Sequence, residues 1–280
     1  MNEKVKGTLL TVLAAVLFST AGICVKLVTW DNLALVAGRS FFTGVSVFLY
    51  FKLTGKPIVI NKAVLVCGAV LSALTTSFVL ATKMTSAANA IVLQYTEPVF
   101  VIFLVWVVYR IKPVKQEIAV IIAAFIGIIC FFFDKLTPGG YIGNIIAVFS
   151  GFLFALVFMA KRMDGADYPS SVFVSAVINF VVGFYQIPSQ TDFRPVTIIM
   201  MMLYGVLPCT LGYIALNAGL DKVSLVTGSV ICMLEPILNP IWVAIFYGER
   251  ITLMSFVGSV ILLSAATVYS IWQVKKDAPQ

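Results

Sequence analysis

The chain has 280 residues, of which 61% are hydrophobic and only 11% are charged. A soluble globular protein of this length needs a larger charged surface, because much of it faces water. The net charge of +7 could suggest nucleic acid as a partner, but the basic residues lie in short clusters between apolar segments and form no basic stripe. The composition therefore indicates a membrane protein and does not support nucleic-acid binding.

Ten apolar segments, separated by short breaks rich in turn residues, follow one another along the chain. The first is longer than the hydrophobic part of a signal peptide, so we expect it to be an uncleaved membrane helix. In chain order the expected helices are residues 7–28, 33–53, 63–82, 87–109, 118–133, 141–160, 171–187, 197–218, 224–247 and 253–272. No break is long enough for a soluble domain, and the chain has no phosphate-binding loop motif of the kind that ATPases carry.

The distribution of basic residues predicts the orientation of these helices. With the N-terminus inside, thirteen basic residues fall in inner segments, four in outer segments (Lys83, Lys135, Arg194 and Arg250), and Lys26 and Arg39 remain within helices. We therefore expect a multi-pass protein of the cell membrane (the plasma or inner membrane) with both termini in the cytoplasm.

An internal repeat is the most informative feature of the sequence. Glu97-Pro98 lies in the fourth expected helix and Glu235-Pro236 in the ninth, 138 residues further on. The first and sixth expected helices align at an offset of 136, which pairs Lys26 with Arg162. A matching Glu-Pro pair at the same place in the fourth helix of each half indicates a duplication.

The repeat divides the chain into residues 1–138 and 139–280, with five helices each. Because five is an odd number, the second half enters the membrane from the opposite side. The predicted fold class is thus an all-α integral membrane protein with ten transmembrane helices in two inverted five-helix repeats, an arrangement that many secondary transporters use for alternating access.

The sequence resembles the EamA-type family of the drug/metabolite transporter superfamily over essentially its whole length. The residues that carry the resemblance are 18–26, Arg39, 85–90 with Glu97-Pro98, and 223–224 with Glu235-Pro236. The resemblance implies a central cavity between two inverted halves and transport of small metabolites, frequently the export of amino acids. Family members often carry Trp where this chain has Phe18. The small four-helix multidrug relatives depend on a Glu in their first helix, and neither repeat of this chain has an acid in its first apolar segment.

Glu97 and Glu235 lie near the middle of their expected helices, where an unpaired charged carboxylate costs several kcal/mol. Both side chains should therefore face the protein interior. Each could serve as a structural clasp to a neighbouring helix or as a site for substrate or a coupling proton. Each following proline also removes a helical hydrogen bond, so the carbonyl groups of Gln94 and Cys232 need other partners, and the helix can bend there.

Two cations, Lys26 and Arg39, are expected toward the outer ends of the first two helices. They could reach the interface with their long side chains, or pair with Asp31 or a substrate carboxylate. Arg39 is the better candidate for an anion, because its guanidinium can hold a carboxylate at two points.

Uncharged polar residues complete the candidate binding site. The predicted substrate-binding set is Lys26, Arg39, Asn89, Gln94, Tyr95, Glu97, Tyr213, Asn217, Glu235 and Asn239. Tyr213 and Asn217 share a helix face with Thr210, because their spacings are three and four residues. Such groups could line a cavity or join helices to one another.

The chain has no histidine, and its five cysteines lie within apolar segments, so we expect no catalytic residues, no metal and no cofactor. We predict a secondary transporter of amino acids or related carboxylate or zwitterionic solutes, and not an enzyme. The expected partners are a small-molecule substrate, the lipid bilayer and a coupling proton or counter-solute, for a monomer or homodimer. A multidrug or cation exporter, a channel and an intramembrane enzyme are the alternatives.

Overall fold

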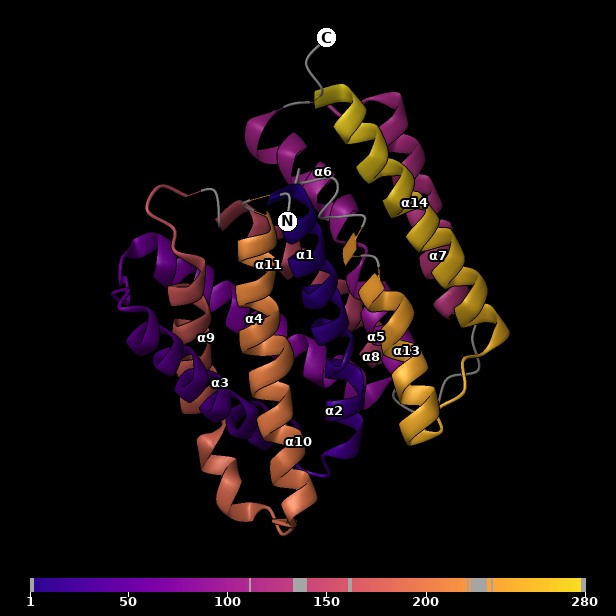
Figure 1. Ribbon diagram of the computed structural model, residues 1–280. Coiled ribbons are helices and arrows are strands. Elements are labelled where there is room, and N and C mark those ends of the chain that lie inside the picture. Colours follow the sequence, from indigo (N-terminus) through magenta and orange to yellow (C-terminus); the bar gives the residue numbers. More distant parts are fainter. Residues whose placement is uncertain are drawn as a thin grey trace.

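A computed structural model describes residues 3–110, 112–132, 140–160, 163–220, 222, 231–232 and 234–277. Every regular element in these ranges is a helix (Figure 1). The elements are α1 Glu3–Ser19, α2 Ala21–Leu27, α3 Asn32–Thr54, α4 Lys62–Met84, α5 Ala87–Gln94, α6 Glu97–Tyr109, α7 Lys115–Phe132, α8 Gly140–Ala160, α9 Tyr168–Gly183, η1 Phe184–Ser189, α10 Pro195–Val206, η2 Leu207–Gly212, α11 Tyr213–Leu220, α13 Leu234–Tyr247 and α14 Leu253–Asp277. The predicted repeat boundary at residue 138, and Lys135, Arg162, Val223 and Ser224, lie outside the described residues.

Seven helical segments of the described chain are long and apolar enough to cross a membrane. They are Glu3–Leu27, Asn32–Thr54, Lys62–Met84, Ala87–Val108, Gly140–Val157, Tyr168–Ser189 and Pro195–Gly219, and Leu234–Tyr247 and Leu253–Tyr269 are shorter apolar helices. Each of the ten expected segments overlaps at least one helix. The chain is therefore all-helical and multi-pass, while ten crossings in inverted order remain a prediction.

Large apolar side chains cover the outside of the bundle, as lipid contact requires. Examples on different helices are Leu9, Phe48, Trp106, Phe125 and Phe256, each about half exposed. In water such a surface would promote association, whereas in a bilayer it faces hydrocarbon. The outer surface thus agrees with the composition.

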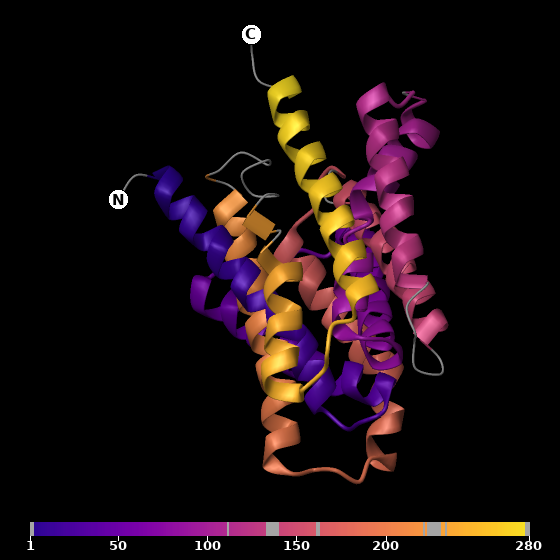
Figure 2. The ribbon, with the colours of Figure 1, turned by 90° about the vertical axis from the view of Figure 1, so that its right-hand side faces the viewer.

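The helices form one bundle with a peripheral pair (Figures 1 and 2). α4 packs against α8 and α9, α3 packs against α9 and α10, and α1 packs against α11 and α13. α7 and α14 pack chiefly against each other at one side of the bundle (Figure 1). α1 begins and α14 ends toward the same end of the bundle, and the link from η1 to α10 lies at the opposite end (Figure 2).

At the first Glu-Pro pair the helix is interrupted, whereas the sequence had predicted only a bend. α5 ends at Gln94 and α6 begins at Glu97, with Pro98 in its first turn, where a missing N–H costs nothing. Thr96 Oγ1 donates to the carbonyl of Leu93 at 2.7 Å, which holds the chain in a turn. Glu97 therefore lies at the start of a helix, whereas the sequence had predicted a position within one.

A glycine on α8 lets that helix approach this break. A Cβ atom on Gly151 would lie 2.6 Å from Thr96 Oγ1 and 2.8 Å from the carbonyl oxygen of Gln94. Both distances are shorter than van der Waals contact, so only glycine fits there. Helix α8 of the second half therefore packs closely against the break between α5 and α6 in the first half.

Candidate functional site

The second Glu-Pro segment makes a polar contact with the first half of the chain through Tyr95. The Tyr95 hydroxyl lies 3.0 Å from Glu235 Oε2 and 3.1 Å from the carbonyl oxygen of Cys232, and it can donate to either. Pro236 has no N–H for that carbonyl, so the expectation that it needs another partner is confirmed. The partner comes from the turn between α5 and α6.

The two acids of the Glu-Pro pairs have different surroundings. Glu235 is joined to Tyr95, whereas the Glu97 carboxylate, half-buried at the start of α6, has no hydrogen-bond partner among the described residues. Close to Glu97, Gln94 Oε1 accepts a hydrogen bond from Ser150 Oγ of α8 at 3.2 Å. Glu235 thus makes the hydrogen bond to another helical segment that a structural role would require, and Glu97 makes none among the described residues.

Arg39 of α3 is buried, with 2% of its surface exposed. Its Nη1 donates to Cys209 Sγ at 3.3 Å, and its guanidinium carbon lies 5.0 Å from the centre of the Tyr204 ring. Among the described residues, Arg39 Nε and Nη2 have no hydrogen-bond partner, and neither does the neighbouring Ser40 Oγ. Arg39 is therefore not at the surface and does not pair with Asp31, whose carboxylate accepts from Gln190 Nε2 at 2.9 Å, while its pairing with a substrate carboxylate stays a prediction.

A small cavity lies beside Arg39, between α3, α4, α9 and η2. Its polar lining comes from Arg39, Ser40, Thr43, Thr75, Ser175, Asn179, Cys209 and Tyr213, and its apolar lining from Leu71, Val172 and Ala176. The cavity volume is about 10 Å³, which is about the space that one water molecule needs. The structure is therefore closed around this site.

The cavity borders an irregular stretch of helix. η2 is a π-helical turn with Pro208 near its start, and such turns often occur at functional sites. The carbonyl of Gly205 accepts from Thr210 Oγ1 at 3.0 Å and from Thr43 Oγ1 at 3.2 Å. Pro208 has no N–H to donate within this helix, and two side-chain hydroxyls donate to the Gly205 carbonyl, so the helix is irregular beside Arg39.

Tyr213, the first residue of α11, lines the cavity beside Arg39. Its ring meets Phe18 edge to face at 4.9 Å and Tyr168 at 5.4 Å. The cavity thus brings together Arg39 and Tyr213 of the predicted binding set, and a separate contact joins Tyr95 and Glu235. Substrate binding by these residues stays a prediction.

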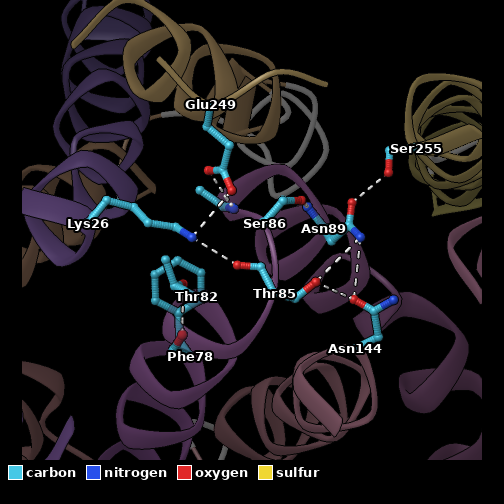
Figure 3. Close-up of polar contacts among 10 residues, drawn as sticks. Lys26, Phe78, Thr82, Thr85, Ser86, Asn89, Asn144, Glu249 and Ser255 are labelled. Atoms are coloured by element: carbon cyan, nitrogen blue, oxygen red, sulfur yellow. Dashed lines mark hydrogen bonds and ion pairs between the residues drawn. The ribbon is translucent and has the colours of Figure 1, made fainter. Parts of the chain in front are cut away.

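Lys26 lies in a second polar cluster, at the end of the bundle where α2 ends (Figure 3). Its Nζ lies 3.3 Å from Glu249 Oε1 and donates to the carbonyl of Thr85 at 2.9 Å. Glu249 Oε2 accepts from the backbone N–H of Ala87 at 3.2 Å. Lys26 therefore pairs with an acid of the other half of the chain, which the sequence had not suggested.

Asn89 continues this cluster into the bundle (Figure 3). Its side-chain amide lies 3.4 Å from Asn144 Oδ1, which also accepts from Thr85 Oγ1 at 2.8 Å, and Asn89 Oδ1 accepts from Ser255 Oγ at 2.7 Å. These contacts join α5 to α8 and α14. Asn89 thus lies with Lys26, away from the cavity at Arg39.

The remaining two predicted residues lie elsewhere. Asn217 is exposed, because the buried face of α11 is formed by Ala215 and Gly219, which follow the buried Gly212 at the end of η2. Asn239 is fully buried, and its side-chain atoms have no hydrogen-bond partner within the described ranges. The structure therefore separates the predicted set into the residues at the cavity, those around the two Glu-Pro segments, a group at one end, and two outlying residues.

Sequence reasoning did not select Ser40, Asn179, Tyr204 or Cys209, although all of them lie around Arg39. Asn179 Oδ1 accepts from Ser72 Oγ at 2.5 Å and from Thr76 Oγ1 at 3.1 Å, which joins α9 to α4. Of these four residues, Asn179 could have been selected from the sequence, because it is a polar residue within an apolar segment. The other three are common in membrane helices and carried no signal.

The helices, the apolar outer surface and the polar contacts between the halves define a multi-pass membrane protein built from two related halves. The model of the EamA-like transporter family matches residues 5–133 and 141–271, so the chain belongs to that family. The chain is 24% identical over 274 residues to a protein of Archaeoglobus fulgidus named "Uncharacterized transporter", with 94% of this chain and 95% of the relative covered.

A protein of known crystal structure has a similar fold. Its TM-score is 0.67 with 14% sequence identity, and the match covers 95% of this chain and 98% of the other. Identity this low supports the fold alone.

Proposed function

We propose that the protein is a secondary transporter of small organic solutes, with amino acids or related carboxylate or zwitterionic solutes as substrates. It works by alternating access at the interface between two inverted five-helix repeats, with α7, α13 and α14 completing ten crossings. The observation that carries this proposal is the contact of Tyr95 with Glu235 and Cys232, since it joins the interrupted Glu-Pro segment of the first half to the Glu-Pro segment of the second. Interrupted helices that meet between repeats are where such transporters bind their substrates.

The ion pair at one end of the bundle and the small cavity at Arg39 both fit a conformation in which the transport path is closed. Lys26 and Glu249 join the halves at one end, and the cavity at Arg39 has room for about one water molecule. Transport then requires the halves to separate at one end at a time. The cell membrane, cytoplasmic termini and export as the direction belong to the same proposal, on the basic residues and the family resemblance.

The alternative substrates and activities fit the site less well. A cation exporter needs an acid beside its substrate. The cavity at Arg39 is lined by a cation and by no acid among the described residues, and Glu235 lies instead at the contact with Tyr95. An intramembrane enzyme needs a nucleophile with a base or a metal site, and the described residues contain no group of three potential metal ligands.

Counterflow in proteoliposomes tests the proposal. Vesicles preloaded with an unlabelled amino-acid mixture should transiently accumulate the same amino acids in radiolabelled form, without ATP, and the accumulation should saturate. The assay should be run with and without a pH gradient. A channel would conduct without counterflow, and vesicles that behave like protein-free vesicles would overturn the proposal for amino acids.

A further inference from the structure

One side of the Arg39 guanidinium, formed by Nε and Nη2, makes no hydrogen bond to the described protein and could bind a ligand. Nη1 donates to Cys209, while Nε and Nη2 have no partner in the part of the chain that the structure describes. These two nitrogens present parallel N–H groups on one side of the guanidinium, the geometry that holds both oxygens of a carboxylate. Ser40 Oγ, the next residue, is also buried without a partner.

The charge of Arg39 is not balanced within the described protein. No Asp or Glu of the described residues forms an ion pair with it, and its contacts are a thiol and an aromatic ring. A buried cation without a counter-anion is strongly unfavourable. A ligand that brings one negative charge would remove this cost.

The cavity limits which anion fits. Arg39 is the only charged residue among those that line it. A single cation balances a monoanion, whereas a phosphate ester with two charges would leave a net negative charge inside the membrane. Leu71, Val172 and Ala176 add an apolar wall, which suits the carbon chain next to a carboxylate.

We propose that Arg39 and Ser40 form the subsite that recognises the carboxylate of the transported solute, with Nε and Nη2 of Arg39 donating to its two oxygens. This rests on the proposed function. The subsite admits the carboxylate when α3 and α9 separate from the helix that contains η2, which is irregular beside Arg39. In the closed structure the space beside Arg39 holds no more than about one water molecule.

Thermal unfolding of the purified protein in detergent tests the subsite, with acetate as the smallest carboxylate probe. Sodium acetate should raise the melting temperature of the wild type more than sodium chloride at equal ionic strength. Arg39→Met should abolish the difference between acetate and chloride. Without acetate, this variant should melt no lower than the wild type, because an unbalanced buried charge has been removed.

Two further variants keep the test decisive. Lys52→Met removes the same charge from an exposed position of the same helix and should keep the acetate effect. Ser40→Ala removes one hydroxyl and should raise the apparent Kd for acetate roughly three- to tenfold, the loss of about one hydrogen bond. Ser40→Ala also decides the outcome if Arg39→Met does not fold.

The possible results are distinguishable. Equal shifts with acetate and chloride in the wild type, or an acetate effect that survives in Arg39→Met, would overturn the carboxylate subsite. Carboxylate counterflow that is unchanged in Arg39→Met would overturn the subsite and leave the proposed function intact. An Arg39-dependent acetate effect without counterflow of any solute would overturn the proposed function instead.

Discussion

Lys26 at the end of α2 and Glu249 in the turn between α13 and α14 form an ion pair of 3.3 Å that links the two halves of the chain. Their side chains are 11% and 22% exposed, so water screens this pair less than a pair on the surface. The backbone carbonyl of Thr85, between α4 and α5, accepts a hydrogen bond from Lys26 (Figure 3). The backbone N–H of Ala87, the first residue of α5, donates to Glu249. Opening this end of the bundle requires the pair to separate.

Glu249→Gln should favour opening at this end. A partly buried ion pair contributes about 1 kcal/mol, which corresponds to a roughly fivefold change in the opening equilibrium. Alkylation of the native Cys24, buried on α2, should therefore become about fivefold faster, as measured by peptide mass spectrometry. Cys67, buried in a separate apolar cluster, provides the control within the same molecule.

The charge-reversed pair Lys26→Glu with Glu249→Lys tests whether the charges themselves act. The double variant should return Cys24 part of the way to slow alkylation, because the attraction between the two side chains is restored, while the carbonyl of Thr85 and the N–H of Ala87 no longer face groups that can bind them. Equal Cys24 rates in the wild type and in both single variants would show that this ion pair does not hold the end closed.

Tyr95→Phe should destabilise the protein by about 1 kcal/mol, since the Tyr95 hydroxyl then no longer donates to Glu235 or to the partly buried carbonyl of Cys232. Thermal unfolding in detergent measures this. Glu97→Gln is the matched comparison near the same break, and it should leave the melting temperature unchanged, because no described hydrogen bond of that carboxylate is lost. A Tyr95→Phe protein as stable as the wild type would mean that the contact is not maintained in solution.

Glu235→Gln separates a structural role from a functional one. The amide oxygen of glutamine can still accept from Tyr95, so membrane insertion and the melting temperature should be kept. If the acid takes part in transport, counterflow measured from pH 5.5 to pH 8.5 should lose its dependence on pH. Counterflow with the wild-type pH profile would identify Glu235 as a structural clasp.

The helices could be predicted from the sequence because apolar length is a local property. The break before Glu97 was predicted only as a bend, since its size depends on Thr96 and on the approach of Gly151 from α8. The Lys26–Glu249 pair joins residues 223 positions apart, and Glu249 lies in a turn, where acids are ordinary. No local pattern could have selected it.

The candidate site could be predicted only in part, because its contacts also join residues that are distant in the sequence. Arg39 and Tyr213 were chosen as polar residues within apolar segments, and both line the cavity. Asn217 was chosen with Tyr213 because of its spacing, but the small residues Ala215 and Gly219 determine which face of α11 is buried. The rotation of a helix within a bundle depends on its neighbours, which one segment of sequence does not contain.

The contact of α2 with α13 should depend on the absence of a side chain at residue 22. A Cβ atom on Gly22 would lie 2.9 Å from Asn239 Cγ and 3.0 Å from Asn239 Nδ2. Gly22→Ala should therefore destabilise the protein by about 1–3 kcal/mol through overpacking, as measured by thermal unfolding. Gly44→Ala is the matched control, because its Cβ would lie 3.8 Å from the nearest side chain and alanine favours helix there.

Asn239→Ala should relieve this clash. Its buried side-chain atoms have no hydrogen-bond partner among the described residues, so their removal leaves none of those residues unsatisfied. The double variant Gly22→Ala with Asn239→Ala should be more stable than the sum of the two single changes predicts. Strict additivity would show that the two residues are not in contact.

The link between η1 and α10 should make stability depend on pH. Arg194 donates to the Asp192 carboxylate from Nε at 2.8 Å and from Nη2 at 2.9 Å, and Thr29 and Thr197 donate to it as well. These bonds, those of Arg194 first, hold the pKa of Asp192 well below its ordinary value of about 4. A lowered pKa adds stability above pH 4, and this stability is lost as the pH falls and the carboxylate is protonated.

Asp192→Asn should therefore lower the melting temperature at pH 7, and the difference from the wild type should shrink as the pH is lowered from 5 to 3. Melting curves in detergent at pH 3, 4, 5 and 7 measure this. Asp164→Asn, at an exposed position in the turn before α9, is the control for loss of a carboxylate and should produce no such narrowing. If the Asp192→Asn difference is the same at all four pH values, the ionised carboxylate is not what stabilises this link.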